Sequence, residues 1–263
     1  MKKIYICLMM FLAFNIGAQE TTEETHTIPL SNPGQAGMLE VDIQNGNITV
    51  ETHSGQDVIV TLIGHNGSKK EKDGTNKYGL KKVSNNVMDT EITEENNYVE
   101  IDGGYKGRMD VHVKVPANFS LELDSHHNSD IMVSNVNGAI EANSHHGEIT
   151  MENISGSVVA DTHHGAIKVA FASIDDSKPM AFSTYHGNVE VTLPASSSFN
   201  PKVKSSRGDV YTDFEIDLRP VSSEGKKKGK YKIGGGWLQG KVGNGGQEMM
   251  MNTYHGDIVI RKA

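Results

Sequence analysis

The sequence predicts an all-β fold, a single-stranded β-solenoid (β-helix) with an irregular N-terminal β part. Three observations predict it. A turn of the form Ser/Thr-x-His-Gly-x-Ile/Val recurs along the chain, a plainer turn alternates with it, and the segments between turns alternate between apolar and polar residues. The 28 glycines and the aromatic content of only 6% favour many tight turns around a narrow core.

The repeated turn has seven versions, each followed by a short β-rich segment. They are Thr52-His53-Ser54-Gly55, Ser125-His126-His127-Asn128, Ser144-His145-His146-Gly147, Thr162-His163-His164-Gly165, Thr184-Tyr185-His186-Gly187, Ser205-Ser206-Arg207-Gly208 and Thr253-Tyr254-His255-Gly256. The closing glycine predicts a backbone position with positive φ, which asparagine also tolerates.

The plainer turn lies between some of these copies. Asn137-Gly138 and Ser155-Gly156 alternate with Gly147 and Gly165 at intervals of about nine residues, as expected of short strands joined by turns. One coil would therefore contain about 18 to 22 residues. Asn45-Gly46 resembles the plain turn of an early coil.

Period-two alternation assigns the side chains to two faces. Within one repeat, Ile140, Ala142, Ser144 and His146 share the predicted inward face. The next repeat places the following residues inward in the same way: Val158, Ala160, Thr162 and His164.

The first half of the chain is less regular but still β-rich. Alternation predicts strands over residues 38–44, 58–63, 87–93, 98–101 and 109–115. Residues 64–82 and 222–246 are polar, glycine-rich insertions, and the second contains Trp237, a candidate cap for an open end of the stack. We expect one β-solenoid domain over residues 19–263.

The N-terminus has the pattern of a secretion signal. Lys2 and Lys3 precede an apolar run over residues 4–14, and small residues follow up to Ala18. Residues 1–18 are therefore predicted to be removed on export to the periplasm, the cell surface or the medium. No further apolar stretch predicts a transmembrane span, and the single cysteine, Cys7, would leave with the signal.

Composition also limits the class of partner. The formal net charge of −8 argues against a nucleic-acid-binding protein, because no basic surface balances the acidic residues. The partner expected instead is a component of the envelope, a glycan or a protein.

Stacking of coils would align equivalent residues in two columns. The predicted corner column contains Ser54, His127, His146, His164, His186, Arg207 and His255, and the outward column contains His53, His126, His145, His163, Tyr185, Ser206 and Tyr254.

The histidine columns have three interpretations. One is a divalent-metal site, for example for Zn²⁺ or Cu²⁺, with Asp124 or Asp161 as an additional partner. Another is a scaffold of stacked flat side chains that needs no cofactor, and the last is a pH response. The metal candidates are His126, His127, His145, His146, His163 and His164.

The sequence predicts no enzymatic activity. It contains no Gly-x-Ser-x-Gly elbow, phosphate-binding loop or His-Glu-x-x-His motif. Carboxylates do project from the predicted outer face, so a carbohydrate-active β-helix enzyme is the alternative. They are Glu122, Asp124, Glu141, Glu152, Asp161 and Glu190.

Several short sequence motifs resemble those of a known family. Four features are similar to the bacterial putative-adhesin family. They are Val115-Pro-Ala-Asn followed by Leu121-x-Leu123, the His/Asn-Gly-x-Ile turns, Val191-Thr-Leu-Pro194 and the closing Thr253-Tyr-His-Gly-Asp-Ile258. This domain-of-unknown-function group of β-strand-repeat envelope proteins is related to the auto-transporter-adhesin-like domains. The resemblance implies a β-helical fold, export and an adhesin-like role, and it supplies no catalytic residues. The histidine doublets and the insertion at residues 64–82 depart from the family pattern.

The function expected from these observations is a non-enzymatic, adhesin-like binding or structural role at the cell envelope. A periplasmic metal-binding protein that uses the stacked histidine turns is a second alternative.

Overall fold

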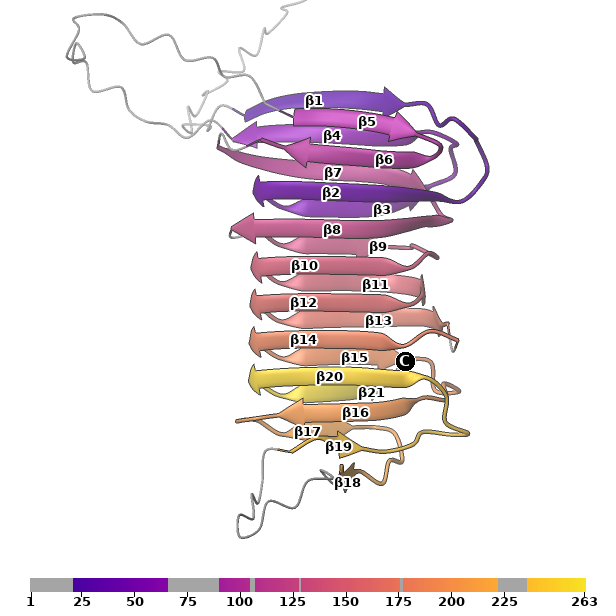
Figure 1. The fold of residues 1–263 in the computed structure, drawn as a ribbon, viewed down its shortest axis with the longest axis vertical. Coiled ribbons are helices and arrows are strands. Elements are labelled where there is room, and N and C mark those ends of the chain that lie inside the picture. Colours follow the sequence, from indigo (N-terminus) through magenta and orange to yellow (C-terminus); the bar gives the residue numbers. More distant parts are fainter. Residues whose placement is uncertain (1–20, 66–89, 105–106, 128, 176, 222–235) are drawn as a thin grey trace, which may run out of the picture.

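A computed structural model of the chain describes residues 21–65, 90–104, 107–127, 129–175, 177–221 and 236–263. Every regular element in these ranges is a β-strand, which confirms the all-β prediction. The strands lie across one long stack (Figure 1). The predicted signal, residues 1–18, and most of the two predicted insertions lie outside the described residues. Within the described ranges, no helix is long and apolar enough to cross a membrane.

The strands form two sheets. In the order in which neighbours pair, the ten-stranded sheet contains β1 (Thr21–Ile28), β4 (Val58–His65), β7 (Arg108–Pro116), β3 (Ile48–His53), β9 (Ile131–Ser134), β11 (Ile149–Gly156), β13 (Ile167–Ile174), β15 (Val189–Leu193), β21 (Ile258–Lys262) and β17 (Val210–Thr212). The eleven-stranded sheet contains β18 (Arg219–Pro220), β19 (Leu238–Gln239), β16 (Asn200–Ser205), β20 (Glu248–His255), β14 (Met180–His186), β12 (Val158–His164), β10 (Ile140–His146), β8 (Phe119–His127), β2 (Gly37–Asn45), β6 (Tyr98–Gly103) and β5 (Thr90–Glu95).

The central part of the stack consists of coils, each made of one strand from each sheet. In β10–β11, for example, the chain crosses the eleven-stranded sheet, turns at His146 and returns through the ten-stranded sheet. Neighbouring coils pair in parallel, with Ile140 opposite Leu121 on one side and Val158 on the other. The offset is 19 residues to Leu121 and 18 to Val158, and it rises to 22 between Val159 and Ala181. These offsets agree with the predicted coil length.

The coils do not stack in chain order at the C-terminal end. The last coil, β20–β21, pairs with β14–β15 on one side and with β16–β17 on the other. In Figure 1 it lies, in yellow, between the orange strands that precede it in the sequence. The C-terminal segment therefore fills an interior position, and the earlier coil β16–β17 lies nearer the end of the stack.

Antiparallel pairing is confined to the two ends. β4 is antiparallel to both β1 and β7, β5 is antiparallel to β6, and β19 is antiparallel to β16 and β18. The expectation of a more irregular N-terminal part is therefore correct. Trp237 lies beside this last group, where Lys202 Nζ and Lys204 Nζ are 5.5 and 5.8 Å from its ring.

One predicted copy of the repeated turn is wrong. Thr52 and His53 end β3 in the ten-stranded sheet, and the chain then enters β4, whose direction is antiparallel to β7. His53 Nε2 lies 2.8 Å from the carbonyl oxygen of Asp57 within this local turn. The early corner is formed by Asn45 and Gly46 instead, with Asn45 in register with His127.

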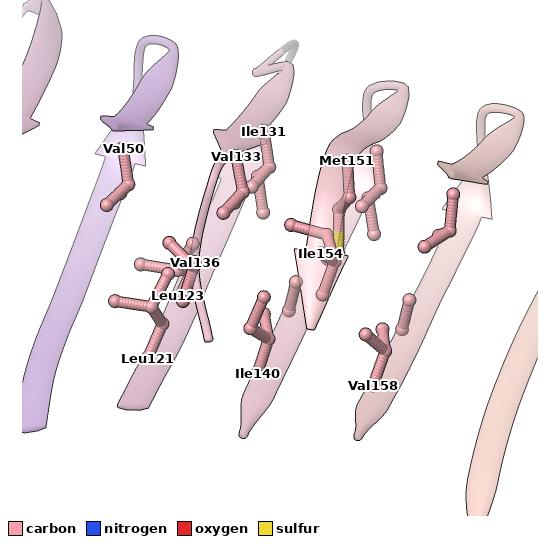
Figure 2. Packing of buried hydrophobic residues seen from close by; sticks show 14 of the residues in the cluster. Val50, Leu121, Leu123, Ile131, Val133, Val136, Ile140, Met151, Ile154 and Val158 are labelled. Carbon is pink, nitrogen blue, oxygen red and sulfur yellow. The ribbon is translucent and has the colours of Figure 1, made fainter. Parts of the chain in front are cut away.

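The core is a narrow layer between the two sheets. Alternate side chains of both sheets point into it, and Leu123, Val133, Met151 and Ile140 meet there (Figure 2). Ala142 and Ala160 are also buried, as the period-two pattern predicts. His146 and His164 are not part of this layer, contrary to the sequence prediction, because each strand has reached the corner and the ring lies outside the core.

Candidate functional site

The repeated turns gather along one edge of the stack, where buried hydroxyl groups join successive coils. Each Ser or Thr of the turn donates a hydrogen bond to a carbonyl oxygen at the corner of a neighbouring coil in the stack. The bonds are Ser125 to Gly46 (3.5 Å), Ser144 to Ser129 (3.2 Å), Thr162 to Gly147 (3.1 Å), Thr184 to Gly165 (2.9 Å), Thr253 to Gly187 (2.9 Å) and Ser205 to Gly256 (2.8 Å). Corner carbonyls inside the stack thus gain partners that strand pairing does not supply.

The closing glycines allow the corners to approach one another. A Cβ atom at Gly165 would lie 1.9 Å from the carbonyl oxygen of Gly147, which is backbone and cannot rotate away. The predicted positive φ holds at Gly187 and Gly256, at 150° and 154°, but it is wrong for Gly147, Gly165 and Gly208. Close approach of backbone to backbone is the requirement shared by these corners.

Four histidines form the corner column. His146, His164, His186 and His255 are in register, and their rings stack in parallel with centroids 4.8, 4.8 and 4.6 Å apart. The interplanar angles of 2 to 9° match those of stacked plates. Parallel strand pairing sets this spacing, because the distance between neighbouring strands is close to the distance that two stacked rings prefer between their centroids.

The outward column runs beside it. His145, His163, Tyr185 and Tyr254 stack with centroids 5.3, 5.1 and 4.8 Å apart. The guanidinium of Arg207 lies 5.3 Å from the centre of the Tyr254 ring. Arg207 therefore covers the end of the outward column and does not continue the corner column, contrary to the sequence prediction.

The corner ring and the outward ring that belong to the same coil form one rung of the two columns, and these two rings contact each other. His145 Nδ1 lies 2.7 Å from His146 Nδ1, and His163 Nδ1 lies 2.7 Å from His164 Nδ1. Four of the six metal candidates thus come together. The remaining two make other contacts: His126 Nε2 is 3.5 Å from Asp42 Oδ1, and His127 Nδ1 is 3.2 Å from the carbonyl oxygen of Gln44. In the part of the chain that the structure describes, no group of three or more His, Cys, Asp or Glu residues forms a metal cage.

Crowding of the rings changes their acidity. Desolvation lowers the pKa of His145, and the charges of His146 and His163 lower it further. Desolvation also lowers the pKa of His164 and of His186, with additional repulsion from His163 at both. These imidazoles therefore remain neutral to a lower pH than an isolated histidine does.

Acidification in metal-free buffer is expected to destabilise the protein. The pKa of each of these histidines is lower in the folded chain than its ordinary value of 6.5, so the unfolded chain binds more protons. Their stabilisation is present above pH 6.5 and is lost as the pH falls from 6.5 through the folded pKa values. Melting curves between about pH 7.5 and about pH 5 measure this loss. Replacement of His145, His164 and His186 by Asn should reduce it, and an unchanged melting temperature in the parent protein would contradict the prediction.

A polar groove of about 290 Å³ lies beside the outward column. His163, Tyr185 and Tyr254 contribute from that column, and the outer face of the eleven-stranded sheet contributes further polar side chains. These are Asp161, Ser183, Lys204 and Asn252. Sequence reasoning identified Asp161 but not Ser183, which is in register with it. It missed Lys204 and Asn252 because these two meet only through the altered order of the last two coils.

The outward carboxylates do not form a catalytic pair in this groove, which has Asp161 as its single acidic side chain. The groove of about 610 Å³ at the end of the stack formed by β16, β18 and β19 likewise contains one, Asp217. Other acidic residues lie side by side on neighbouring strands: Glu40 of β2 is in register with Glu100 of β6 and with Glu122 of β8. Burial, followed by repulsion from Glu122 and Glu100, raises the pKa of Glu40.

Comparison with known proteins gives one match over nearly the whole chain. The family model described as Toastrack DUF4097 matches residues 8–261. No curated protein gives a significant match.

Solved structures provide more distant similarities. A putative cell adhesion protein from Clostridium sporogenes is 11% identical, with a TM-score of 0.46 and coverage of 93% of this chain and 100% of that chain. A putative adhesin from Bacteroides fragilis is 8% identical, with a TM-score of 0.43 and coverage of 94% and 98%. The family match is the finding that assigns the chain, and it confirms the resemblance to a domain-of-unknown-function family that the repeated sequence motifs indicate. The chain belongs to the Toastrack DUF4097 family.

Proposed function

We propose that this chain is an exported, non-enzymatic binding protein of the cell envelope, adhesin-like in that a rigid single-stranded β-solenoid presents a row of polar side chains to a glycan. The observation that carries the proposal is the groove beside His163, Tyr185 and Tyr254, on the outer face of the stack. Export rests on the predicted signal over residues 1–18.

The arrangement of the rings favours a hydroxylated ligand. Tyr185 stacks on His163 and Tyr254 with interplanar angles of 3° and 2°, so its faces are covered by its neighbours. A ligand in the groove therefore meets ring edges and phenolic hydroxyl groups, together with the polar side chains of Ser183 and Asn252. Such edges offer hydrogen bonds that repeat along the stack, which suits a chain of sugar units.

The scaffold itself supports a binding role. Coils in parallel register hold successive side chains at fixed spacing with no loop between them, so a ligand binds without ordering a flexible segment. The groove contains a single carboxylate, whereas glycoside hydrolysis uses two. These features favour recognition over catalysis.

A glycan array probed with the purified exported chain tests the proposal. Replacement of Tyr185 and Tyr254 together by Phe keeps the stacked rings and removes the hydroxyl groups of two residues that line the groove. We expect this variant to bind about tenfold or more weakly, corresponding to about 1.4 kcal/mol or more of lost hydrogen bonding.

The matched control is Tyr211→Phe, because Tyr211 is exposed on the ten-stranded sheet, away from the groove. Its binding should equal that of the parent chain. Absence of binding across a broad panel of glycans, or equal loss in the control, would overturn the proposal.

A further inference from the structure

Two neighbouring rungs of the ring columns each contain a pair of imidazoles whose nitrogens face each other. In both pairs the two Nδ1 atoms lie 2.7 Å apart. The ring planes meet at 76° in the pair His145–His146 and at 70° in the pair His163–His164. The same local geometry is thus built twice, in β10 and in β12.

The short distance requires a shared hydrogen or a shared cation. Two Nδ1 lone pairs at 2.7 Å would repel, so without metal one ring donates its Nδ1–H to the other. A transition-metal ion binds imidazole nitrogen at about 2.0–2.1 Å, which separates two such ligands by about 3.3 Å in a tetrahedral site. The pair needs to open by only about 0.6 Å to accept the ion, with both rings in the Nε2–H tautomer.

Exposure of the rings determines the kind of site. His145, His163 and His164 are exposed, and no third His, Cys, Asp or Glu completes a cage around either pair in the described ranges. Water or an external ligand would fill the remaining positions, so the ion would exchange readily. Imidazole donors of this type favour Cu²⁺ over Zn²⁺.

Spacing along the stack keeps the two pairs separate. Ring centroids of successive rungs are 5.3 Å apart in the outward column and 4.8 Å apart in the corner column. Two nitrogens that share one ion in the same tetrahedral geometry lie about 3.3 Å apart, well below these spacings. Each rung therefore forms its own site.

We propose that His145 with His146, and His163 with His164, form two separate sites for a divalent transition-metal ion, with Cu²⁺ bound more tightly than Zn²⁺. The rungs that contain His186 and His255 do not have such a pair of imidazoles. Tyr185 and Tyr254 occupy the outward position beside His186 and His255, and a phenol there supplies no second imidazole nitrogen. The proposal does not depend on the occupant of the groove.

Titration of the purified exported chain with Cu²⁺, followed by calorimetry and electron paramagnetic resonance, tests the two sites. We expect the parent chain to bind two ions with two nitrogen ligands each at these rungs. Replacement of His145 and His163 by Asn removes one nitrogen from each pair and should weaken binding at both by at least about tenfold. Zn²⁺ should bind to the same rungs more weakly.

A gain-of-site variant and two controls complete the test. Tyr185→His places a second imidazole beside His186, and the number of bound ions should rise by one. His186→Asn and His126→Asn leave both pairs intact and should leave the stoichiometry unchanged. The proposal is overturned if the double Asn variant still binds two ions at the parental affinity, or if Tyr185→His adds none. The second outcome can be measured even if the double variant does not fold.

Discussion

Replacement of Gly165 by alanine is expected to lower the free energy of unfolding by more than about 3 kcal/mol. A Cβ atom there would lie 1.9 Å from the oxygen and 2.5 Å from the carbon of the Gly147 carbonyl group. Because both partners are backbone, no side-chain rotation relieves the overlap. The two coils must separate at the corner, which also strains the hydrogen bond that joins them there, from the Thr162 hydroxyl to the Gly147 carbonyl oxygen.

Chemical denaturation followed by far-ultraviolet circular dichroism measures this loss. Gly236→Ala is the matched control, because nothing lies within 4 Å of the position where its Cβ atom would be placed. The control should unfold at the same denaturant concentration as the parent chain. Equal stability of the two variants would show that the corners can separate at little cost, in contradiction to the close approach seen here.

Replacement of Thr184 by valine is expected to destabilise the protein by about 1–3 kcal/mol. The hydroxyl of Thr184 is buried and donates a 2.9 Å hydrogen bond to the carbonyl oxygen of Gly165. Valine has nearly the same shape, so the core packing is retained while that carbonyl loses its partner inside the stack. The cost is therefore that of an unsatisfied buried acceptor and not that of a cavity.

Thermal and denaturant melts of the Thr184→Val and Thr184→Ser variants separate these effects. Serine keeps the hydroxyl group and loses only a methyl group, so it should retain most of the stability. If serine destabilised the protein as much as valine did, the hydrogen bonds from these hydroxyl groups to the corner carbonyls would not explain why the repeated turn contains Ser or Thr. The same reasoning applies to Thr162 and Thr253, which donate to Gly147 and Gly187.

The candidate site was predictable in part. The sequence placed His145, His146, His163 and His164 in two neighbouring columns, because parallel coils align residues that share a position in the repeat. It also included His126 and His127, whose nitrogens instead face Asp42 and Gln44 of the first coil. Side-chain partners of this kind depend on the neighbouring coil, which here is 83 residues away in the sequence.

The polar groove could not be predicted from the sequence. Lys204 and Asn252 belong to β16 and β20, which are adjacent only because the last coil lies between β14 and β16. Nothing in the repeat itself distinguishes this order from stacking in chain order, since each coil presents similar strands to its neighbours.

The sequence by itself determined the all-β class, the two turns of each coil, the coil length and the inward residues such as Ile140 and Ala142. These properties follow from short-range rules, namely turn chemistry and the period of two along a strand, which a single repeat already contains. The tertiary structure alone decided the order of the coils, the orientation of the imidazole pairs and the role of each corner Ser or Thr. The physical reason is that these depend on contacts between repeats, such as the bond from Thr253 to Gly187 across 66 residues, and similar repeats leave the choice of neighbour to the packing of the whole stack.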